Sequence, residues 1–231
     1  MNLSVIIPTR NESLRIVNLV DYLKRYGGEE LLEIIVVDAV DSKDGTMEKV
    51  PDGKTIALKS SFACRAIQMN EGAAIAQGDI LYFVHADVIP PQKYALEIMS
   101  SVEQGNDYGF FSYAFQSEKL ILKINSYFTR FSNIFTGGGD QTFYIKKDIF
   151  NEYNGFDSSI ALMEDFDFFY RLKKDKRKYE IIPNDVLVSA RKYDHNSYLK
   201  VNLMKLLTLS LFKFGFAPAK LKVFYNRVLK L

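Results

Sequence analysis

Two almost unbroken apolar runs near the start of the chain constrain its fold more than any other feature. They span residues 3–7 and 32–37, and each contains a single polar residue. Runs of this kind are typical of strands that are covered on both faces, as in parallel sheets. Between them, apolar residues recur at helical spacing from Ile16 to Tyr26, and a glycine pair follows. The sequence therefore opens with a strand, a helix and a second strand, the unit of an α/β fold.

The same alternation continues along the chain. The further elements that we expect are a strand near residues 55–58, a helix over about 64–77, strands over 80–84 and 141–145, a helix over about 164–173, and strands near 179–182 and 186–188. Thr9 and Glu12 have the spacing of a capping box, which predicts that the first helix begins directly after Thr9. We find no internal repeat or low-complexity linker, so the simplest division is one domain over residues 1–195 and a helical tail over 196–231.

Composition excludes several classes of protein. With 231 residues, of which 48% are hydrophobic and 25% charged, the chain can bury about 70–75% of its unfolded surface around an ordinary core. Cys64 is the single cysteine, so we expect no internal disulfide, no cysteine-based zinc site and a reducing compartment. The first residues lack the pattern of a secretory signal, and no run of about 18 apolar residues occurs, so we expect a cytoplasmic protein without a membrane-spanning helix.

The C-terminal residues differ in charge from the rest. Between Asn196 and Leu231 there are seven basic residues and no acidic residue, whereas the part before Asn196 has a net charge of −5. Apolar residues are dense over 199–214, and a second helix is expected after Pro218. Two interpretations stay open. Residues 199–229 pack on the sheet or form a homodimer contact, or they attach the protein to the inner face of an anionic membrane as a peripheral protein.

Acidic residues gather where the predicted strands end. Asp38 follows the second strand, and Asp87 follows the strand over 80–84. In an open α/β sheet, ligands bind outside the carboxyl ends of the strands. A single carboxylate at such a place most often caps a helix or is solvated, but a series of them indicates a binding edge. The further members of the series are Asp41, Asp44, Glu164, Asp165 and Asp167.

The common nucleotide-binding and catalytic motifs are absent. The chain has no G-x-x-x-x-G-K-[ST], no G-x-G-x-x-G after the first strand and no G-x-S-x-G. Phosphate-loop hydrolases, dinucleotide oxidoreductases and serine hydrolases therefore lose most of their support. The chain has two histidines, His85 and His195, which argues against a histidine-rich zinc site. The basic run over residues 171–178 lacks interleaved aromatic residues, so we expect no nucleic-acid partner.

Several short stretches together resemble the family 2 glycosyltransferases of the nucleotide-diphospho-sugar transferase (GT-A) fold. Residues 5–12 (VIIPTRNE) look like the opening signature of that family, as do residues 35–38 (IVVD) followed by 44–46 (DGT). A bacterial subgroup is closer still, and the resemblance covers about residues 3–192. The stretches similar to that subgroup are residues 68–74 (QMNEGAA), 85–87 (HAD), 139–141 (GDQ), 164–165 (ED) and 189–191 (SAR).

The resemblance implies a fold and an activity. The fold would be an α/β GT-A fold, with a mostly parallel central sheet flanked by helices and a C-terminal helical tail. The activity would be that of an inverting hexosyltransferase, which moves a sugar from a nucleotide-diphospho-sugar, such as a UDP- or GDP-sugar, to an acceptor hydroxyl. The Q-x-x-R-W motif of processive polysaccharide synthases is missing, which favours transfer of a single sugar. If residues 199–229 bind a membrane, we expect the acceptor to be lipid-linked.

The resemblance also implies site residues. Asp165 matches the family's catalytic base, and Glu164 matches its partner. Asp87 matches the last aspartate of a D-x-D motif, which ligates Mg²⁺ or Mn²⁺ on the donor diphosphate. The residues that would surround the nucleoside are Pro8, Glu12, Asp38 and Arg65. Those that would lie against the donor sugar and the acceptor are Gly138, Gly139, Asp140 and Gln141.

The chemistry of sugar transfer agrees with these positions, although two features depart from the family's pattern. A base must take the acceptor proton, and positive charge must stabilise the leaving diphosphate. Asp165 would supply the first and a metal at Asp87 the second, with inversion if Asp165 works on the face opposite the diphosphate. His85 replaces the first acid of the D-x-D motif, which leaves fewer hard oxygen ligands. The loop after Asp38 is one residue longer than usual, so roles for Asp41 and Asp44 stay open.

Two other functions stay open on the sequence alone. A nucleotidyltransferase on a similar fold would usually carry a glycine-rich, basic loop after the first strand, where this chain offers only Arg10. A sugar-nucleotide-binding protein without catalytic activity would have no need for both Asp87 and Asp165.

Overall fold

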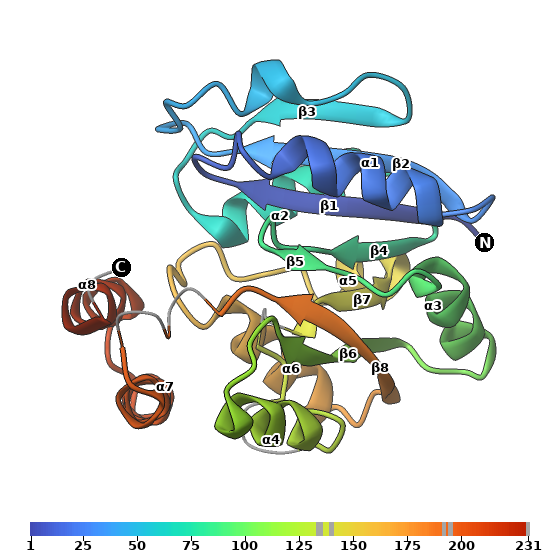
Figure 1. Ribbon diagram of the computed structural model, residues 1–231. Helices are drawn as coiled ribbons and strands as arrows, with labels where there is room; N and C mark the ends of the chain where they lie inside the picture. Colours follow the sequence, from blue (N-terminus) through green and yellow to red (C-terminus); the bar gives the residue numbers. More distant parts are fainter. Residues whose placement is uncertain (133–135, 139–140, 191–192, 194–195, 230–231) are drawn as a thin grey trace.

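The central feature of the molecule is one mixed sheet. The computed structural model describes residues 1–132, 136–138, 141–190, 193 and 196–229, and their strands form a sheet in the order β3-β2-β1-β4-β7-β6-β8-β5 (Figure 1). The strands are β1 (Leu3–Thr9), β2 (Leu31–Asp38), β3 (Thr55–Lys59), β4 (Ile80–Phe83), β5 (Val88–Ile89), β6 (Tyr108–Phe115), β7 (Phe143–Lys146) and β8 (Tyr179–Val188). Strands β5 and β7 run antiparallel to their neighbours, and the other pairs are parallel. The predicted α/β fold with a mostly parallel sheet is confirmed.

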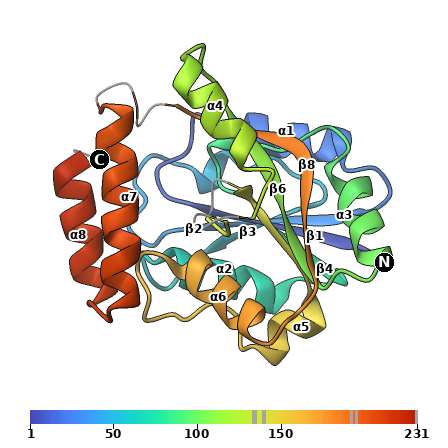
Figure 2. The same cartoon turned by 90° about the horizontal axis from the view of Figure 1, so that it is seen from below.

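Helices cover both faces of this sheet. They are α1 (Ile16–Tyr26), α2 (Arg65–Ile75), α3 (Tyr94–Glu103), α4 (Leu120–Phe128), α5 (Lys147–Glu152), α6 (Glu164–Lys174), α7 (Tyr198–Lys213) and α8 (Pro218–Leu229), with a short 3₁₀ helix, η1 (Met47–Lys49). Helices α1, α3 and α4 pack on one face, and α2, α5 and α6 pack on the other. The view from below shows the two layers on either side of the strands (Figure 2).

Strand β1 shows why its apolar run is continuous. Val5 and Ile7 belong to the core under α1 and α3, whereas Ile6 belongs to the core under α2 and α6. All three side chains have no exposed surface. Successive residues of a strand point to opposite faces, so a strand covered on both sides needs an apolar residue at every position. Each such side chain contributes about 1.5–3 kcal/mol of burial free energy.

The capping-box prediction at Thr9 is wrong. The first helix begins at Ile16, and Thr9 is the last residue of β1. The Thr9 hydroxyl donates to the Asp38 carboxylate over 2.9 Å instead of accepting from a helix N–H group. Asn11 has a φ of 56°, which turns the chain away before the helix starts.

The two short strands expected near the end of the domain are one strand. Strand β8 runs from Tyr179 to Val188 and pairs in parallel with β6. Its register shifts between Phe111 and Tyr113 of β6. An irregularity of this kind interrupts the alternation of apolar residues, which explains why the sequence pattern splits there.

The C-terminal helices form an antiparallel pair beside the carboxyl edge of the sheet, on the left in Figure 1. The Asn196 side chain donates to the Leu229 carbonyl over 2.9 Å, which joins the start of α7 to the end of α8. The hydroxyl of Tyr198 accepts from Asn125 of α4 over 2.9 Å. At the other end of α7, Lys213 Nζ lies 4.8 Å from the centre of the Tyr170 ring of α6. The pair therefore contacts the domain at both ends of α7.

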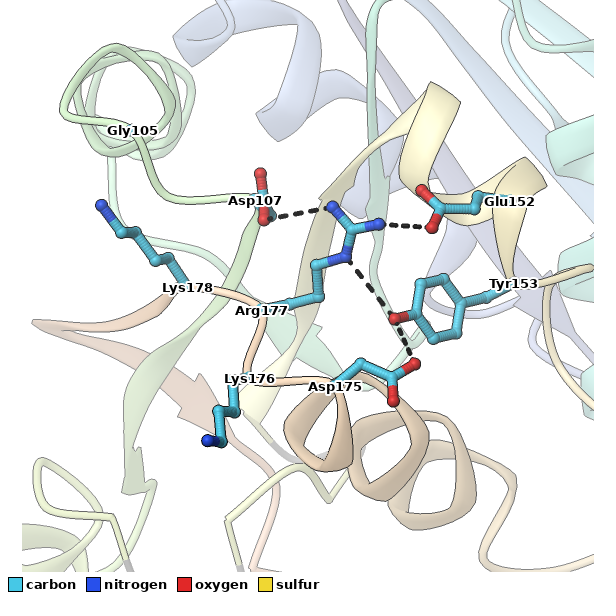
Figure 3. Close-up of a pocket in the computed structure, with 8 residues that line it drawn as sticks. All are labelled: Gly105, Asp107, Glu152, Tyr153, Asp175, Lys176, Arg177 and Lys178. Atoms are coloured by element: carbon cyan, nitrogen blue, oxygen red, sulfur yellow. Dashed lines mark hydrogen bonds and ion pairs between the residues drawn. The ribbon is translucent and has the colours of Figure 1, made fainter.

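A network of charged side chains lies at the opposite edge, where β6 and β8 begin. Arg177 contacts Glu152, and its Nη1 lies 3.9 Å from Asp107 (Figure 3). Tyr153 donates to Asp175 over 2.7 Å. These residues line a hollow of about 550 Å³. Its lining carries three acidic side chains and three basic ones, so the hollow offers no net charge to a ligand.

Candidate functional site

The ends of the first four strands bring Asp38 and Asp87, two of the predicted site residues, to one edge of the sheet. Thr9 ends β1, Asp38 ends β2 and Lys59 ends β3. The turn over residues 85–87 follows β4. Because β1 to β4 run parallel, their carboxyl ends lie on the same side, where α/β sheets bind ligands.

Asp38 is the most buried acidic residue of this edge. Its residue is 1% exposed, and its two oxygens accept from the Thr9 hydroxyl over 2.9 Å and from Lys59 Nζ over 3.0 Å. The side chain of Lys59 is 41% exposed, so a ligand at this point meets Lys59 before Asp38. Each carboxylate oxygen can accept a second hydrogen bond, which leaves Asp38 able to receive an N–H donor once a ligand reaches it.

Lys59 is a further candidate site residue, which the sequence pattern does not single out, because its Nζ lies 3.0 Å from Asp38 at this edge. Asp38 and Lys59 are register partners in the parallel pairing of β2 with β3. A lysine at the end of a third strand looks like an ordinary solvated residue. Its position could have indicated a role, because the last residues of neighbouring parallel strands lie side by side at one edge of the sheet.

Gln68 and Asn70 of the QMN stretch hold backbone segments around the candidate site in place. Gln68 is 4% exposed and donates to the carbonyls of Thr9 and Val37, each over 2.7 Å, so it ties the ends of β1 and β2 together. Asn70 donates to the Phe156 carbonyl over 2.8 Å and accepts from the Phe156 N–H over 3.0 Å. Asn70 thereby fixes the segment that leads into α6.

The acidic loop after β2 is cross-linked to the loop after β1. Asp41 accepts from Arg10 over 3.0 and 2.6 Å, and Asp44 accepts from the backbone N–H of Ser13 over 2.9 Å. Burial acts to raise the pKa of Asp44, but hydrogen bonds from Thr46 and Ser13 outweigh it and lower the pKa to about 2. Asp41 and Asp44, whose roles the sequence left open, therefore hold the two loops together.

The two remaining predicted nucleoside contacts of these loops are partly buried. Pro8 lies in β1, one residue before its end. Glu12 Oε2 lies 2.7 Å from Arg15 Nη1, and the Glu12 backbone N–H donates to Thr46 Oγ1 over 3.0 Å. The pair of Glu12 and Arg15 stands at the entrance of α1, on the same edge as Asp38.

Asp87 occupies the turn between β4 and β5. The Val88 N–H donates to the His85 carbonyl over 3.1 Å, which closes the turn, and the Ser189 N–H reaches the Asp87 carbonyl over 3.4 Å. Asp87 is partly exposed. Within the described residues, no group of three or more His, Cys, Asp or Glu side chains is placed to hold a metal ion. Any ion at Asp87 would therefore take most of its ligands from a bound molecule and from water.

Glu164 and Asp165 stand at the start of α6 in different surroundings. Glu164 is 2% exposed, and its Oε1 lies 3.2 Å from Nη1 of Arg65, the first residue of α2. Asp165 is partly exposed. Met163 precedes them with a φ of 76°, a left-handed conformation that is costly for this residue type. The Glu164 carboxylate is therefore buried in an ion pair, and the adjacent Asp165 is partly exposed.

The glycine-rich segment is shaped by Gln141. This residue is 2% exposed, accepts from the Gly137 N–H over 2.9 Å and donates to the Thr129 carbonyl over 3.3 Å. Gly138 is partly exposed. Gly139 and Asp140 lie outside the described residues. Gln141, which was expected to touch the sugar or the acceptor, holds the backbone of the segment in this structure.

The edge thus carries carboxylates in contrasting environments. Asp38 and Glu164 are buried and paired with a lysine and an arginine, and Asp87 and Asp165 are partly exposed. A buried, paired carboxylate can position or recognise a group, and an accessible one can ligate a cation or accept a proton.

A sequence profile places the chain among known proteins. The profile described as glycosyl transferase family 2 matches residues 4–161. A search of curated protein sequences finds no significant match.

Solved structures share the fold at low sequence identity. A mannosyltransferase, PcManGT, from Pyrobaculum calidifontis in complex with GDP-Man and Mn²⁺ superposes with a TM-score of 0.64 and 19% identity, over 97% of this chain and 68% of that one. TarS 1-349 of S. aureus in complex with UDP gives a TM-score of 0.64 and 14% identity, over 99% and 70%. The same protein with UDP-GlcNAc gives 0.62 and 16%, over 99% and 70%. The similarity confirms the expected GT-A type of fold.

Proposed function

The chain belongs to glycosyl transferase family 2, and from this premise we propose that it transfers a single sugar, with inversion, from a nucleotide-diphospho-sugar to an acceptor hydroxyl. The observation that carries the proposal is the meeting of Asp38, Asp87 and the start of α6 at the carboxyl edge of the sheet. The Arg65–Glu164 contact of 3.2 Å joins α6 to that edge.

The donor is a nucleoside diphosphate carrying a sugar. Structures with the same fold hold GDP-Man, UDP and UDP-GlcNAc, which supports a UDP- or GDP-sugar here. Asp38 receives an N–H of the base, because it is a fixed acceptor at the end of β2. Lys59 neutralises Asp38 between turnovers, and Pro8, Glu12 and Arg65 complete the wall around the nucleoside.

Asp165 is the catalytic base. It takes the proton from the acceptor hydroxyl as that oxygen bonds to the anomeric carbon, and the bond from this carbon to the diphosphate breaks. The nucleoside diphosphate leaves with the electron pair. Glu164 is a positioning residue, because its pair with Arg65 fixes the first turn of α6 and therefore the place of Asp165.

The donor set at Asp87 fits a divalent cation held mainly by the substrate. Mg²⁺ is commonly bound through one or two carboxylates together with substrate phosphates and water, and a single accessible carboxylate meets that need. The relative from Pyrobaculum calidifontis was solved with Mn²⁺. A bound Mg²⁺ or Mn²⁺ would supply positive charge to the leaving diphosphate. Asp87 would hold that ion, and His85 adds no hard oxygen ligand.

The proposed transfer inverts the anomeric carbon. Asp165 acts on the acceptor, on the face of the sugar opposite the diphosphate, so a single displacement inverts the anomeric carbon. No enzyme nucleophile is required. Gly138, Gly139, Asp140 and Gln141 belong to the segment that borders the sugar and the acceptor.

A donor screen tests the proposal. Purified protein is incubated with a panel of sugar nucleotides and Mn²⁺, and thermal shift and release of the free nucleoside diphosphate are recorded. We expect stabilisation by UDP- or GDP-sugars and slow release of the diphosphate. Release of pyrophosphate from a nucleoside triphosphate and a sugar phosphate would indicate a nucleotidyltransferase instead. Binding of a donor without turnover, in the presence of a broad set of acceptors, would indicate a non-catalytic binder.

A further inference from the structure

Helix α4 presents an apolar face to the outside. Leu122 and Ser126 are buried against β6, while the opposite side of the helix is exposed. Leu120 is 72% exposed, and the other exposed members of this face recur at helical spacing. They are Ile121, Ile124, Tyr127 and Phe128, and Phe131, beyond the end of the helix, is exposed as well. A packed helix in a globular domain normally has a polar outer face, so this set marks an interaction surface.

The turn between α7 and α8 exposes two phenylalanines. Phe214 is 83% exposed and Phe216 is 56% exposed, and they flank Gly215. Leu199 and Leu203 on the outer side of α7 are also exposed. Large aromatic side chains at the tip of a helical turn bury little surface in the folded monomer, so they lower the free energy only when a partner covers them.

Helix α4 lies next to the start of the C-terminal helix pair. A hollow lies between them, and its lining includes Lys119 and Ile121 from the α4 side and Ser197 and Tyr198 from the start of α7. The hydrogen bond of 2.9 Å between Asn125 and Tyr198 closes this junction. At the far end of α7, Lys213 lies over the Tyr170 ring of α6. Exposed apolar residues therefore occur on α4, along α7 and at the α7–α8 turn, and the end of α7 contacts α6.

The positive charge of α7 and α8 favours an anionic lipid surface as the partner. The basic residues of the C-terminal pair are Lys200, Lys205, Lys213, Lys220, Lys222 and Arg227, and no acidic residue occurs from Asn196 to the end of the chain. In a symmetric dimer the same patch meets itself, so this surface would set two clusters of positive charge against each other. An anionic lipid surface attracts such a cluster and also accepts apolar side chains at the boundary of headgroups and acyl chains.

We propose that the outer face of α4 and the α7–α8 turn together form a docking surface for the interface of an anionic bilayer. Phe214 and Phe216 insert at the acyl boundary, and the lysines of α7 and α8 contact the headgroups. No helix within the described residues is long and apolar enough to span a bilayer. On the proposed function, this surface brings a lipid-borne hydroxyl to the edge that carries Asp165, which makes a lipid-linked acceptor the class that the site receives.

Vesicle flotation tests the surface without using donor, metal or turnover. Full-length protein is mixed at low ionic strength with phosphatidylcholine vesicles, with and without about one third phosphatidylglycerol. The test variants are Phe214→Ser with Phe216→Ser, Leu120→Ser with Ile124→Ser, and Lys220→Glu with Lys222→Glu. Leu96→Ser is the matched apolar control, because Leu96 is 56% exposed on α3, away from this surface. Lys174→Glu with Lys178→Glu is the matched charge control.

We expect binding to anionic vesicles and weak binding to neutral ones. Each test variant should bind about tenfold less, and both controls should bind as the wild type does. Wild-type protein that stays with the soluble fraction in the presence of anionic vesicles would overturn the proposal. So would equal binding by the test variants, or a wild-type dimer that the phenylalanine variant converts to a monomer. If the protein binds vesicles but releases no nucleoside diphosphate in the donor screen, the docking surface is supported and the proposed function is wrong.

Discussion

Nη1 of Arg65 lies 3.2 Å from Oε1 of Glu164, and this contact joins the first residue of α2 to the first residue of α6. The Glu164 side chain is 3% exposed and the Arg65 side chain 46%. The carboxylate is therefore the desolvated member of the pair. Because Asp165 follows Glu164 directly, the same contact sets the position of the proposed base relative to the carboxyl edge.

Arg65→Ala should destabilise the protein. It leaves a buried carboxylate without its cation, which costs about 1–3 kcal/mol in the free energy of unfolding. Lys123→Ala is the control, since the side chains of its pair with Glu118 are 54% and 96% exposed and such surface pairs contribute about 0–1 kcal/mol. Urea unfolding measures both. Equal stability of Arg65→Ala and the wild type would show that the Glu164 carboxylate does not depend on this pair.

Asp87→Ala should remove most of the donor affinity together with its dependence on a divalent cation. Asp87 is the proposed protein ligand of the ion that holds the diphosphate. Calorimetric titration of UDP and GDP, with Mn²⁺ and with EDTA, gives the affinities. If wild-type protein binds the nucleoside diphosphate equally well in EDTA, the metal assignment at Asp87 is wrong.

The pair of Asp38 and Lys59 should show coupling in a double-mutant cycle. Lys59→Met leaves the buried Asp38 carboxylate without a cation, so a loss of about 1–3 kcal/mol is expected. The further change Asp38→Asn removes that charge, so the double variant should recover part of the loss. Asp38→Asn alone should weaken nucleoside diphosphate binding. Strictly additive stability changes, measured by urea unfolding, would argue that the contact of 3.0 Å carries no energy.

The lowered pKa of Asp44 predicts that the stability of the protein falls at acidic pH. Its pKa in the folded protein is about 2, below the ordinary value of 3.8. A lowered pKa means that the folded state favours the carboxylate, so the contribution is complete above about pH 4 and is lost as the pH falls toward 2. The difference in Tm between Asp44→Asn and the wild type should therefore become smaller as the pH falls from about 4 to about 2. A constant gap across the interval would contradict the assignment.

The sheet was predictable from the sequence because its strands are buried on both faces. In β1, β2 and β4 nearly every position must be apolar, and a run of apolar residues is a strong local signal. Helices α3 and α5 have no comparable local signal and were not predicted. The helix start predicted at Thr9 is wrong because the Thr9 hydroxyl donates to Asp38, which lies 29 residues further along the chain. A local pattern cannot show such a distant partner.

Site chemistry was predictable only where residue type and place were both unusual. Asp38, Asp87 and the Glu164–Asp165 pair stand at ends of expected elements. The partners that set their environments, Lys59 and the particular contact with Arg65, come from other elements and depend on strand register and helix packing. Those relationships form only in the folded chain.

The central claim is that Asp165 is the base that takes the acceptor proton, and one comparison of turnover numbers tests it most directly. Asp165→Asn keeps the shape of the side chain and removes its ability to accept a proton, so kcat should fall by about 10²–10⁴ while donor affinity is unchanged. Asp167→Asn is the matched control, because Asp167 lies in the same turn and pairs with Arg171 over 2.9 Å. Measured with the donor found by the screen, a loss confined to Asp165→Asn supports the account. Retention of half or more of the wild-type kcat by Asp165→Asn would contradict it.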